Sequence, residues 1–262
     1  MEKWNRFLAK NSWFSYTLMG ITLASVWFYY FSCERGLIFT VIFSFLAAFI
    51  YCLVPVGAAN KLTIKTIKKL DDECDPYPML LETENQLSYV KNANRRQLCI
   101  INRATALSCM GRFNEAYGQL CAIDIDELPG TTPDTKAIYY ANLSSHALGV
   151  GEFQQSVLYH AKASQMTSLL KNPKVKDILF SSLRATSAEQ AIESGEYQTA
   201  LELVRSIEVK AKRQSVNNAF LYAKIALAQG DSENARANLL YVINNGNKLG
   251  CVEEARKLLE ML

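Results

Sequence analysis

The sequence predicts an all-α protein in which a membrane-embedded helical hairpin precedes a solenoid of about four helix-turn-helix units. Two observations predict this fold class. Two long stretches near the N-terminus contain no charged residue, one from Asn11 to Cys33 and one from Gly36 to Asn60. Farther along, a six-residue phrase recurs four times, and apolar residues follow it at three- and four-residue spacing, the period of an amphipathic helix.

The two uncharged stretches have the length of transmembrane helices. A spanning helix needs about 20 apolar residues, and residues 13–32 and 37–56 meet that requirement. A signal peptide has a shorter apolar core followed by small residues at its cleavage site, whereas the first stretch ends in the bulky run from Val26 to Phe31. We therefore expect residues 1–60 to form an uncleaved two-span hairpin.

The charges beside the spans predict the orientation of the hairpin. Three basic residues precede the first span and four lysines follow the second, namely Lys3, Arg6, Lys10, Lys61, Lys65, Lys68 and Lys69. The short connection between the spans contains only Arg35, next to Glu34. Basic flanks stay in the cytoplasm. We therefore expect a multi-pass protein of the cell membrane with two spans, both termini cytoplasmic, and Cys33 at the outer tip.

Neither span contains an acidic, basic or histidine side chain. Ionisable residues inside the bilayer are the usual mark of a transport pathway. The hairpin is therefore expected to be an anchor that holds residues 61–262 at the membrane, and a transporter is disfavoured.

The sequence changes in character after Asn60, which sets the expected domain boundaries. Residues 61–78 combine an amphipathic juxtamembrane stretch and an acidic linker with two prolines. The basic face of that stretch suits anionic headgroups, although a stop-transfer flank explains the same lysines. Residues 79–262 are expected to form a helical repeat domain. Residues 61–262 carry 24 basic and 23 acidic side chains, a balance that gives no indication of nucleic-acid binding.

The recurring phrase is typical of a turn between two helices. Its copies are GRFNEA from Gly111, GEFQQS from Gly151, GEYQTA from Gly195 and GDSENA from Gly230. Glycine suits the left-handed position that ends a helix. The aromatic residue two positions later is expected to plug the space between helices, and the small residue five positions later lets their backbones approach. Only Ser232 departs from the aromatic position, and only Ser156 from the alanine. A second small residue stands seven positions before each glycine, namely Ala104, Ser144, Ala188 and Ala223.

This phrase in its helix-turn-helix setting resembles the tetratricopeptide repeat (TPR), from about Gln97 to the C-terminus. The phrases are 40, 44 and 35 residues apart, whereas the family period is about 34 residues, and we assign the extra length to loops at 124–135 and 170–174. Arg103 and Arg184 stand near positions that the family usually fills with leucine or tryptophan. Residues 79–91 are expected to add a half repeat and residues 252–262 a capping helix. The whole architecture resembles membrane-anchored TPR-like proteins of Gram-positive bacteria.

No catalytic, cofactor or metal motif stands out. The seven cysteines contain no C-x-x-C pair, and His146 and His160 have no acid at metal-ligand spacing. No phosphate-binding loop, metalloprotease motif or serine-hydrolase motif occurs. We therefore expect a protein that is not an enzyme, with no cofactor, no metal and no evident small-molecule substrate. Cys33 is either an idle thiol or a residue that pairs between chains.

Stacked helical hairpins present a concave surface that is lined by the first helix of each unit. The TPR resemblance therefore implies a groove for a protein or peptide partner. Projected onto this chain, the candidate groove residues are Asn102, Thr105, Asn142, Ser145, Glu189, Asn217, Phe220 and Lys224, with Ile101, Ala141 and Ala185 beside them. They lack the Lys/Asn pattern with which some family members clamp a C-terminal carboxylate. Packing between helices explains the same positions about equally well.

Three functions fit these features. The leading hypothesis is a non-catalytic membrane-tethered adaptor or scaffold whose cytoplasmic repeats bind a protein or peptide partner. A peptide-binding sensor at the membrane would use the same groove, but such proteins normally need an output domain. An enzyme of unrecognised type is the third alternative. Co-purification of a stoichiometric protein favours the adaptor, and thermal stabilisation by a peptide favours the sensor.

Overall fold

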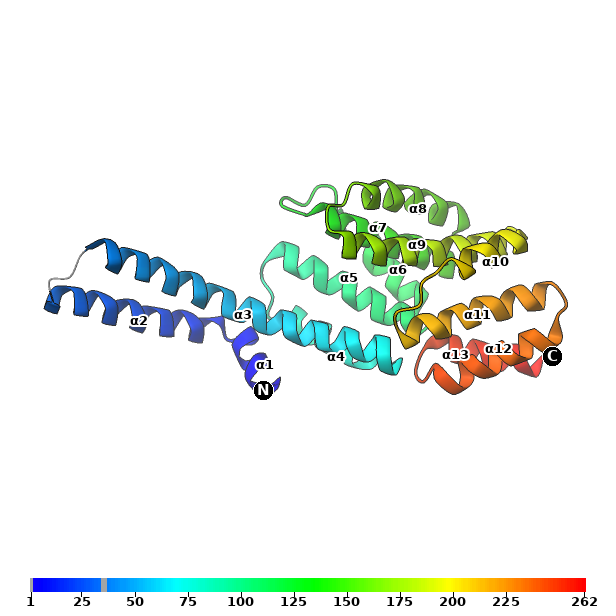
Figure 1. Ribbon diagram of the computed structural model, residues 1–262, viewed down its shortest axis with the longest axis horizontal. Coiled ribbons are helices and arrows are strands. Elements are labelled where there is room, and N and C mark those ends of the chain that lie inside the picture. Colours follow the sequence, from blue (N-terminus) through cyan, green and yellow to red (C-terminus); the bar gives the residue numbers. More distant parts are fainter. Residues whose placement is uncertain (1, 34–36) are drawn as a thin grey trace. The chain divides into compact units, whose positions relative to one another are not determined.

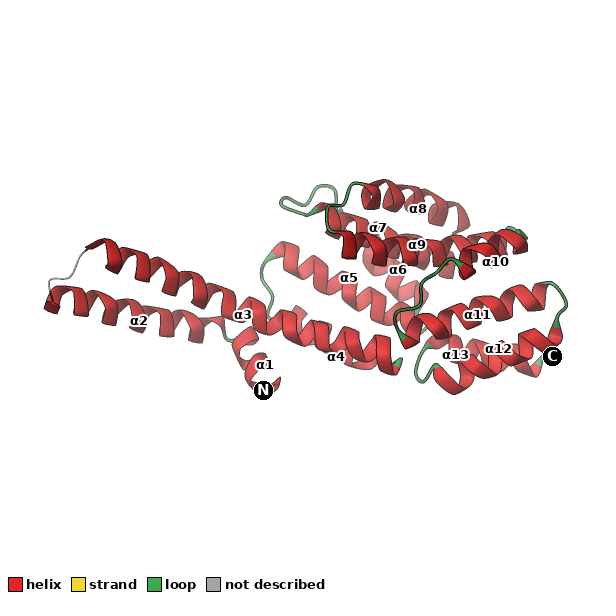
Figure 2. Cartoon of the chain, in the orientation of Figure 1, coloured by secondary structure: helices red, strands yellow, loops and turns green. Residues whose placement is uncertain are grey.

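The computed structural model describes residues 2–33 and 37–262 (Figure 1). This part of the chain consists of helices and loops and contains no strand (Figure 2), which confirms the all-α class. The helices are α1 (Glu2–Lys10), α2 (Ser12–Cys33), α3 (Leu37–Glu73), α4 (Tyr77–Leu87), α5 (Ala93–Cys109), α6 (Phe113–Cys121), α7 (Pro133–Gly149), α8 (Phe153–Ser168), α9 (Pro173–Glu193), α10 (Tyr197–Arg205), α11 (Lys212–Ala228), α12 (Ser232–Asn245) and α13 (Gly250–Glu260). The expected tip of the hairpin lies outside the described residues, and so does the side chain of Cys33.

The chain divides into two compact units, Met1–Thr66 and Ile67–Leu262. In the first unit, the Thr22 hydroxyl of α2 lies 3.1 Å from the Tyr51 hydroxyl of α3. Most large apolar side chains of this unit face outward, and the rings of Phe28, Phe39 and Phe45 are each more than 70 % exposed. A water-soluble helical hairpin would turn such side chains toward a partner.

Helix α3 is the one helix of the described residues that is long and apolar enough to cross a membrane. Only 6 % of its most apolar stretch is buried, so this stretch is not the core helix of a globular domain. Helix α2 is 22 residues long and uncharged, but its serine, threonine, tyrosine and tryptophan residues make it less apolar than the apolar stretch of α3. One candidate span is therefore present, and the second span stays a prediction.

Each copy of the six-residue phrase forms a turn between two helices, as the sequence predicts. Its glycine has a positive φ of 78° at Gly111, 85° at Gly151, and 76° at both Gly195 and Gly230. In the third turn, the Gly195 amide donates to the Ile192 carbonyl, and the next amide donates to the Ala191 carbonyl at 2.8 Å. The other three turns repeat this Schellman pattern, which satisfies the carbonyl groups at a helix end.

The two helices of every hairpin cross at a pair of small residues. The four pairs are Ala104 with Ala116, Ser144 with Ser156, Ala188 with Ala200, and Ala223 with Ala235. All eight residues have 0 % exposure. In the serine pair, the Ser144 hydroxyl donates to the Ser156 carbonyl at 2.8 Å, and the Gln190 side-chain amide donates to the Ser156 hydroxyl at 2.8 Å. These bonds satisfy the buried hydroxyl groups that alanine would lack.

The aromatic residue of the phrase packs between helices in only part of the repeats. A Cβ atom on Gly149 would lie 2.4 Å from the Phe113 ring, so this ring fills the space that glycine leaves on the next hairpin. Tyr197 packs against the core of α9 to α11. Phe153 is 36 % exposed, which corrects the expectation of a plug there. The position equivalent to Gly149 in the following hairpin is Glu193, which does not provide the same space.

The two inserted segments end in helix-start signals, as their composition predicts. Thr132 precedes Pro133 and accepts a hydrogen bond from the Thr135 amide, and Asn172 likewise caps the helix that begins at Pro173. Proline at the first helical position lacks an amide that would have no intrahelical partner anyway. The first loop is also tied down by Asp126, which accepts from the Tyr140 hydroxyl at 2.6 Å.

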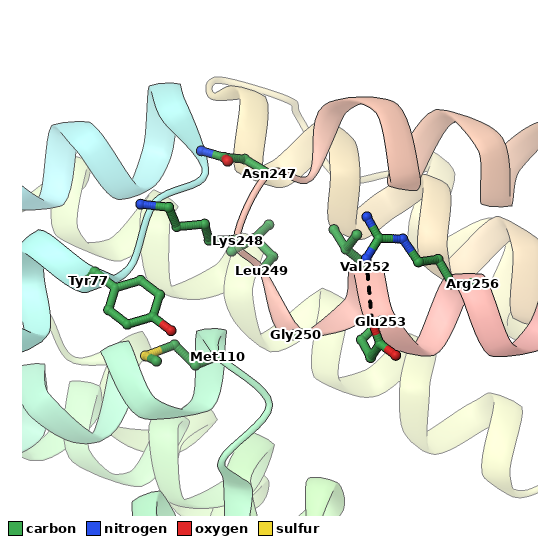
Figure 3. Close-up of a pocket in the computed structure, with 9 residues that line it drawn as sticks. All are labelled: Tyr77, Met110, Asn247, Lys248, Leu249, Gly250, Val252, Glu253 and Arg256. Atoms are coloured by element: carbon green, nitrogen blue, oxygen red, sulfur yellow. Dashed lines mark hydrogen bonds and ion pairs between the residues drawn. The ribbon is translucent and has the colours of Figure 1, made fainter.

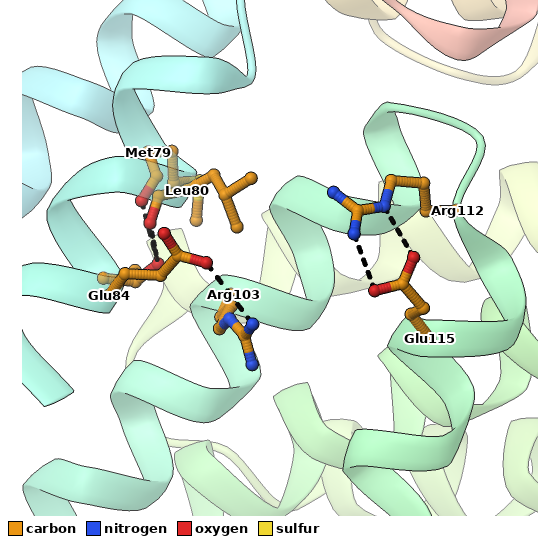
Figure 4. A network of polar contacts seen from close by, with 7 residues as sticks. Met79, Leu80, Glu84, Arg103, Arg112 and Glu115 are labelled. Atoms are coloured by element: carbon orange, nitrogen blue, oxygen red, sulfur yellow. Dashed lines mark hydrogen bonds and ion pairs between the residues drawn. The ribbon is translucent and has the colours of Figure 1, made fainter.

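The two arginines that depart from the TPR pattern have specific partners. The Arg103 guanidinium lies 3.3 Å from the Glu84 carboxylate of α4 (Figure 4). Arg184 donates to the carbonyl of Ser206 at 3.4 Å, where Ser206 caps the C-terminus of α10. Arg103 therefore joins the half repeat α4 to the first unit, and Arg184 places positive charge at a helix C-terminus, where it is favourable.

The first helices of the hairpins form a closed ring within the second unit. Helices α5, α7, α9 and α11 contact one another in order, and α13 contacts both α11 and α5. Helix α13 thus occupies the place of a fifth first helix in addition to capping α12. The concave surface expected of a solenoid is the interior of this ring, called the interior face below.

The second unit begins at Ile67, before the boundary at residue 79 that we expected. Residues 61–73 continue α3 as a helix, and Leu70 and Cys74 are buried in the core of the repeats at 2 % and 0 % exposure. The acidic residues of the expected linker bind other parts of this unit, as shown below. Much of the expected linker is therefore an integral part of the repeat domain.

The crossing of the hairpin helices predicts the effect of a larger side chain. We expect Ala200→Leu to destabilise the protein by about 1–3 kcal/mol because the residue has no free space at the crossing. The control Ala237→Leu, at an exposed position of α12, should change the unfolding free energy by less than about 0.5 kcal/mol. Thermal and urea unfolding measure both changes. Equal stability of the two variants would contradict the assigned crossing.

Candidate interaction surface

The candidate groove residues lie on the first helices of the hairpins. Asn102 and Thr105 belong to α5, Asn142 and Ser145 to α7, Glu189 to α9, and Asn217, Phe220 and Lys224 to α11. The structure links two of them across the first interface. The Asn142 side-chain amide donates to the Thr105 hydroxyl at 3.2 Å, which connects α7 with α5 on the interior face.

A second group of candidate residues meets between α9, α11 and α13. The Lys224 ammonium lies 4.8 Å from the centre of the Phe220 ring, a cation–π distance. The same ammonium lies 3.2 Å from the Glu254 carboxylate of α13. Lys224 also attracts the Glu189 carboxylate of α9. One lysine therefore interacts with two carboxylates, Glu254 and Glu189, on two different helices. Together they form a charged cluster on the interior face.

Burial separates the candidate positions into two classes. Ile101, Ala141 and Phe220 are buried, with exposures of 1, 5 and 7 %, so packing between helices accounts for these three. The other candidates are half-buried or exposed, namely Asn102, Thr105, Asn142, Ser145, Ala185, Glu189, Asn217 and Lys224. This second class is polar except for Ala185. A partner on the interior face would therefore meet amides, hydroxyls and charges.

Glu189 is the least solvated charge of the cluster. Burial raises the pKa of its carboxyl group, the neighbouring carboxylates Glu254 and Glu193 raise it further, and Lys224 counteracts part of the shift. The ammonium of Lys224 thus pairs with Glu254 and acts on Glu189, and Glu193 adds a third carboxylate that acts on Glu189. The local charge is negative when all three carboxylates are ionised. Such a cluster favours a cationic group on a partner.

Glu254 and Glu193 are members of this cluster that the repeat pattern does not single out. Glu254 lies in residues 252–262, for which the pattern predicts only a cap, whereas α13 takes the place of a first helix in a fifth unit. Extending the repeat by one further unit would have indicated that Glu254 faces the interior. Glu193 lies one turn after Glu189 on α9, so helical spacing alone could have indicated it.

A pocket of about 510 Å³ lies beside the first two turns of α13 (Figure 3). It is lined by Tyr77, Met110, Asn247, Lys248, Leu249, Gly250, Val252, Glu253 and Arg256. The Lys248 ammonium lies 5.3 Å from the centre of the Tyr77 ring and 2.7 Å from the Asp75 carboxylate. Arg256 pairs with Glu253 at 3.4 Å. The cations of the pocket are therefore already matched by carboxylates of the chain.

The two histidines contribute to packing and not to the interior cluster. His146 is 2 % exposed, and neither ring nitrogen has a hydrogen-bond partner among the described residues. Burial lowers its pKa to about 4, so the ring is neutral at physiological pH. His160 bonds to the Ser187 hydroxyl at 2.9 Å and the Leu183 carbonyl at 3.1 Å, which joins α8 to α9. Within residues 2–33 and 37–262, no group of three His, Cys, Asp or Glu side chains could hold a metal.

Comparison with known families finds one match over most of the repeats. The family model described as the SusR N-terminal TPR domain matches residues 79–244, which is more than half of the chain. The match includes the four turn phrases and ends before α13. Neither characterised proteins nor solved structures gave a significant match.

The environment of Glu189 predicts a pH-dependent stability effect. Because its pKa is raised in the folded state, the folded protein holds the proton to higher pH than the unfolded chain does, and stability falls as pH rises above the ordinary value of 4.5. We expect Glu189→Gln to raise the melting temperature at pH 7 and to lose that advantage toward pH 4. The control Glu196→Gln, at an exposed position, should change little at either pH. A Glu189→Gln variant that is less stable at pH 7 would contradict this account of the cluster.

Proposed function

The chain belongs to the family of the SusR N-terminal TPR domain, and from this membership we propose that it is a non-catalytic, membrane-tethered adaptor. At the coarse level, a TPR domain is a scaffold for protein–protein interaction. The specific proposal is that the interior face of the ring binds a protein or peptide partner at the cytoplasmic side of the membrane. The observation that carries it is the charged cluster of Glu189, Lys224 and Glu254 between α9, α11 and α13.

The chemistry of the interior face supports a peptide-like partner. Asn102, Asn142 and Ser145 offer donors and acceptors of the kind that bind a polypeptide backbone. The excess of carboxylates around Lys224 favours a lysine or arginine side chain. A folded protein with an exposed basic loop or tail fits both features.

The exposed apolar surface of the first unit supports the tether. Helix α3 is long and apolar enough to cross a bilayer, and four lysines follow its apolar part. We propose that α2 and α3 both span the membrane, with residues 61–262 in the cytoplasm. The lysines of residues 61–69 would then lie near the headgroups of the cytoplasmic leaflet.

A peptide sensor is the second candidate, and the closed ring is the observation that favours it. An enclosed interior face suits a short segment better than a long extended chain. The probe is a synthetic ten-residue peptide with alternating lysine and alanine, and an acidic peptide of the same length is the control. Stabilisation of the protein by the basic peptide alone, with no co-purifying protein, would favour the sensor over the adaptor.

The adaptor proposal predicts loss of the partner when the charged cluster is altered. The full chain should co-purify a stoichiometric protein from gently solubilised membranes. We expect Lys224→Met to reduce this yield at least fivefold while the protein stays folded at the assay temperature, because methionine keeps an apolar stem over Phe220 and removes the ammonium. Lys171→Glu, at an exposed position outside the interior face, is the control and should retain the partner. An unchanged yield with Lys224→Met would refute the assigned surface.

The proposed topology predicts which thiols a membrane-impermeant reagent can reach. Cys121 is exposed on the second unit, so its labelling depends on access and not on unfolding. In intact cells, an impermeant maleimide should leave Cys121 unlabelled, and permeabilisation should allow complete labelling. Labelling of Cys121 in intact cells would place the repeats outside and reverse the orientation.

A further inference from the structure

We propose that the ring of first helices opens at one defined seam, between α13 and the start of the repeat domain, while every hairpin stays folded. The seam consists of residues 247–250 and Arg213 on one side, and residues 71–75 with the turn at Met110 and Gly111 on the other. This inference rests on the proposed function for its biological meaning, because opening would admit a partner to the interior face. Its test requires no partner.

Polar contacts between residues far apart in the sequence hold the seam together. Arg213 pairs with Asp71 at 2.8 Å, and Lys248 pairs with Asp75 at 2.7 Å. The Asn247 side-chain amide donates to the Glu73 carbonyl at 2.8 Å, and the Lys248 amide donates to the Cys74 carbonyl at 3.2 Å. Figure 3 shows Lys248 and Asn247 reaching toward the segment that precedes α4.

Two glycines, Gly250 and Gly111, allow the backbones on the two sides of the seam to come into direct contact. A Cβ atom on Gly250 would lie 2.4 Å from the Gly111 nitrogen and 2.6 Å from its Cα atom. Backbone atoms cannot move aside as the end of a flexible side chain can. Gly250 begins α13, where alanine would otherwise be the better helix former. The glycine is therefore required by the close approach of α13 to the α5–α6 turn.

The seam differs from the other interfaces of the ring in its place along the chain. The remaining contacts between first helices join hairpins that are neighbours in sequence, whereas the contact of α13 with α5 joins the two ends of the repeat domain. In repeat proteins, stability comes mainly from each unit and its neighbours. Separation of the seam leaves all neighbour contacts intact, so it costs less free energy than unfolding of the repeats.

The chain contains its own reporters of seam opening. Cys74 is 0 % exposed at the seam, and Cys99 is 5 % exposed between α4 and α5, away from it. Burial raises the pKa of both thiols, so neither is intrinsically activated. Cys109 and Cys251 lie beside the glycine contact, so we expect them to report seam opening in the same way as Cys74. Cys121 is exposed and reports the unprotected labelling rate.

The experiment measures alkylation of each cysteine in the native full-length protein. The protein, solubilised in mild detergent at constant pH, is treated with N-ethylmaleimide, and mass spectrometry of its peptides follows each thiol over time. We expect Cys74 to be alkylated at least tenfold faster than Cys99, because local opening exposes only the former. Raised NaCl should increase the rate at Cys74 and leave that at Cys99 unchanged, since salt screens the seam ion pairs.

Two variants at the seam and two matched controls sharpen the test. Gly250→Ala forces the backbones apart, and Asp75→Asn removes one ion pair while keeping the side-chain shape. Both should raise the rate at Cys74 at least fivefold without changing Cys99. Gly118→Ala places a Cβ in open space within α6, and Glu84→Gln weakens the pair with Arg103 that joins α4 to α5, off the seam (Figure 4). Neither control should change the rate at Cys74.

The outcomes distinguish the proposal from its alternatives. If Cys74 and Cys99 are protected equally, and the seam variants accelerate both together, the ring opens only by unfolding and the proposal is wrong. If Gly250→Ala fails to fold, Asp75→Asn and the salt series still decide the matter. A failure to find a co-purifying partner would count against the adaptor and leave these labelling rates unaffected.

Discussion

The close approach of two helices at a pair of small residues is the constraint on which the repeat domain depends. In each of the four hairpins, the two residues at the crossing are separated by twelve positions and have no exposed surface. Any larger side chain would push the helices apart. The glycine turn between them sets the direction of the second helix so that the crossing can form. Ser144 and Ser156 keep the same geometry by hydrogen bonding where alanine is absent.

Close approach at small residues also closes the ring. Gly250 and Gly111 meet backbone to backbone, so α13 reaches the turn that ends α5. Closure converts a concave surface into an interior face, while packing of α13 on its neighbour α11 places Glu254 3.2 Å from Lys224. The charged cluster that supports partner binding is therefore a product of the stacked helices and not of any single hairpin. Burial raises the pKa of Glu189, and the nearby carboxylates Glu254 and Glu193 raise it further.

The two units handle apolar side chains in opposite ways. In the first unit, large rings such as Phe28 and Phe45 face outward, as is typical of a surface that contacts a membrane or a protein partner. In the second unit, leucine, isoleucine, valine and alanine fill the core between helices. The basic residues that follow the apolar part of α3 mark the point along the chain where outward-facing apolar side chains give way to buried ones. This division supports a membrane anchor joined to a domain that folds by packing of its own helices.

The sequence by itself determined the helices, the turn glycines and the small-residue crossings. Each of these depends on residues within about one hairpin, where periodicity and the left-handed preference of glycine act directly. The candidate groove residues lie on the first helices of the hairpins, and their role in binding stays a prediction. Only the tertiary structure decided that the ring closes, that Arg213 pairs with Asp71, and that Glu254 joins the interior face. These contacts depend on the small rotation of each hairpin relative to the one before it. The rotations add up along the domain, and no local pattern in the sequence predicts the total.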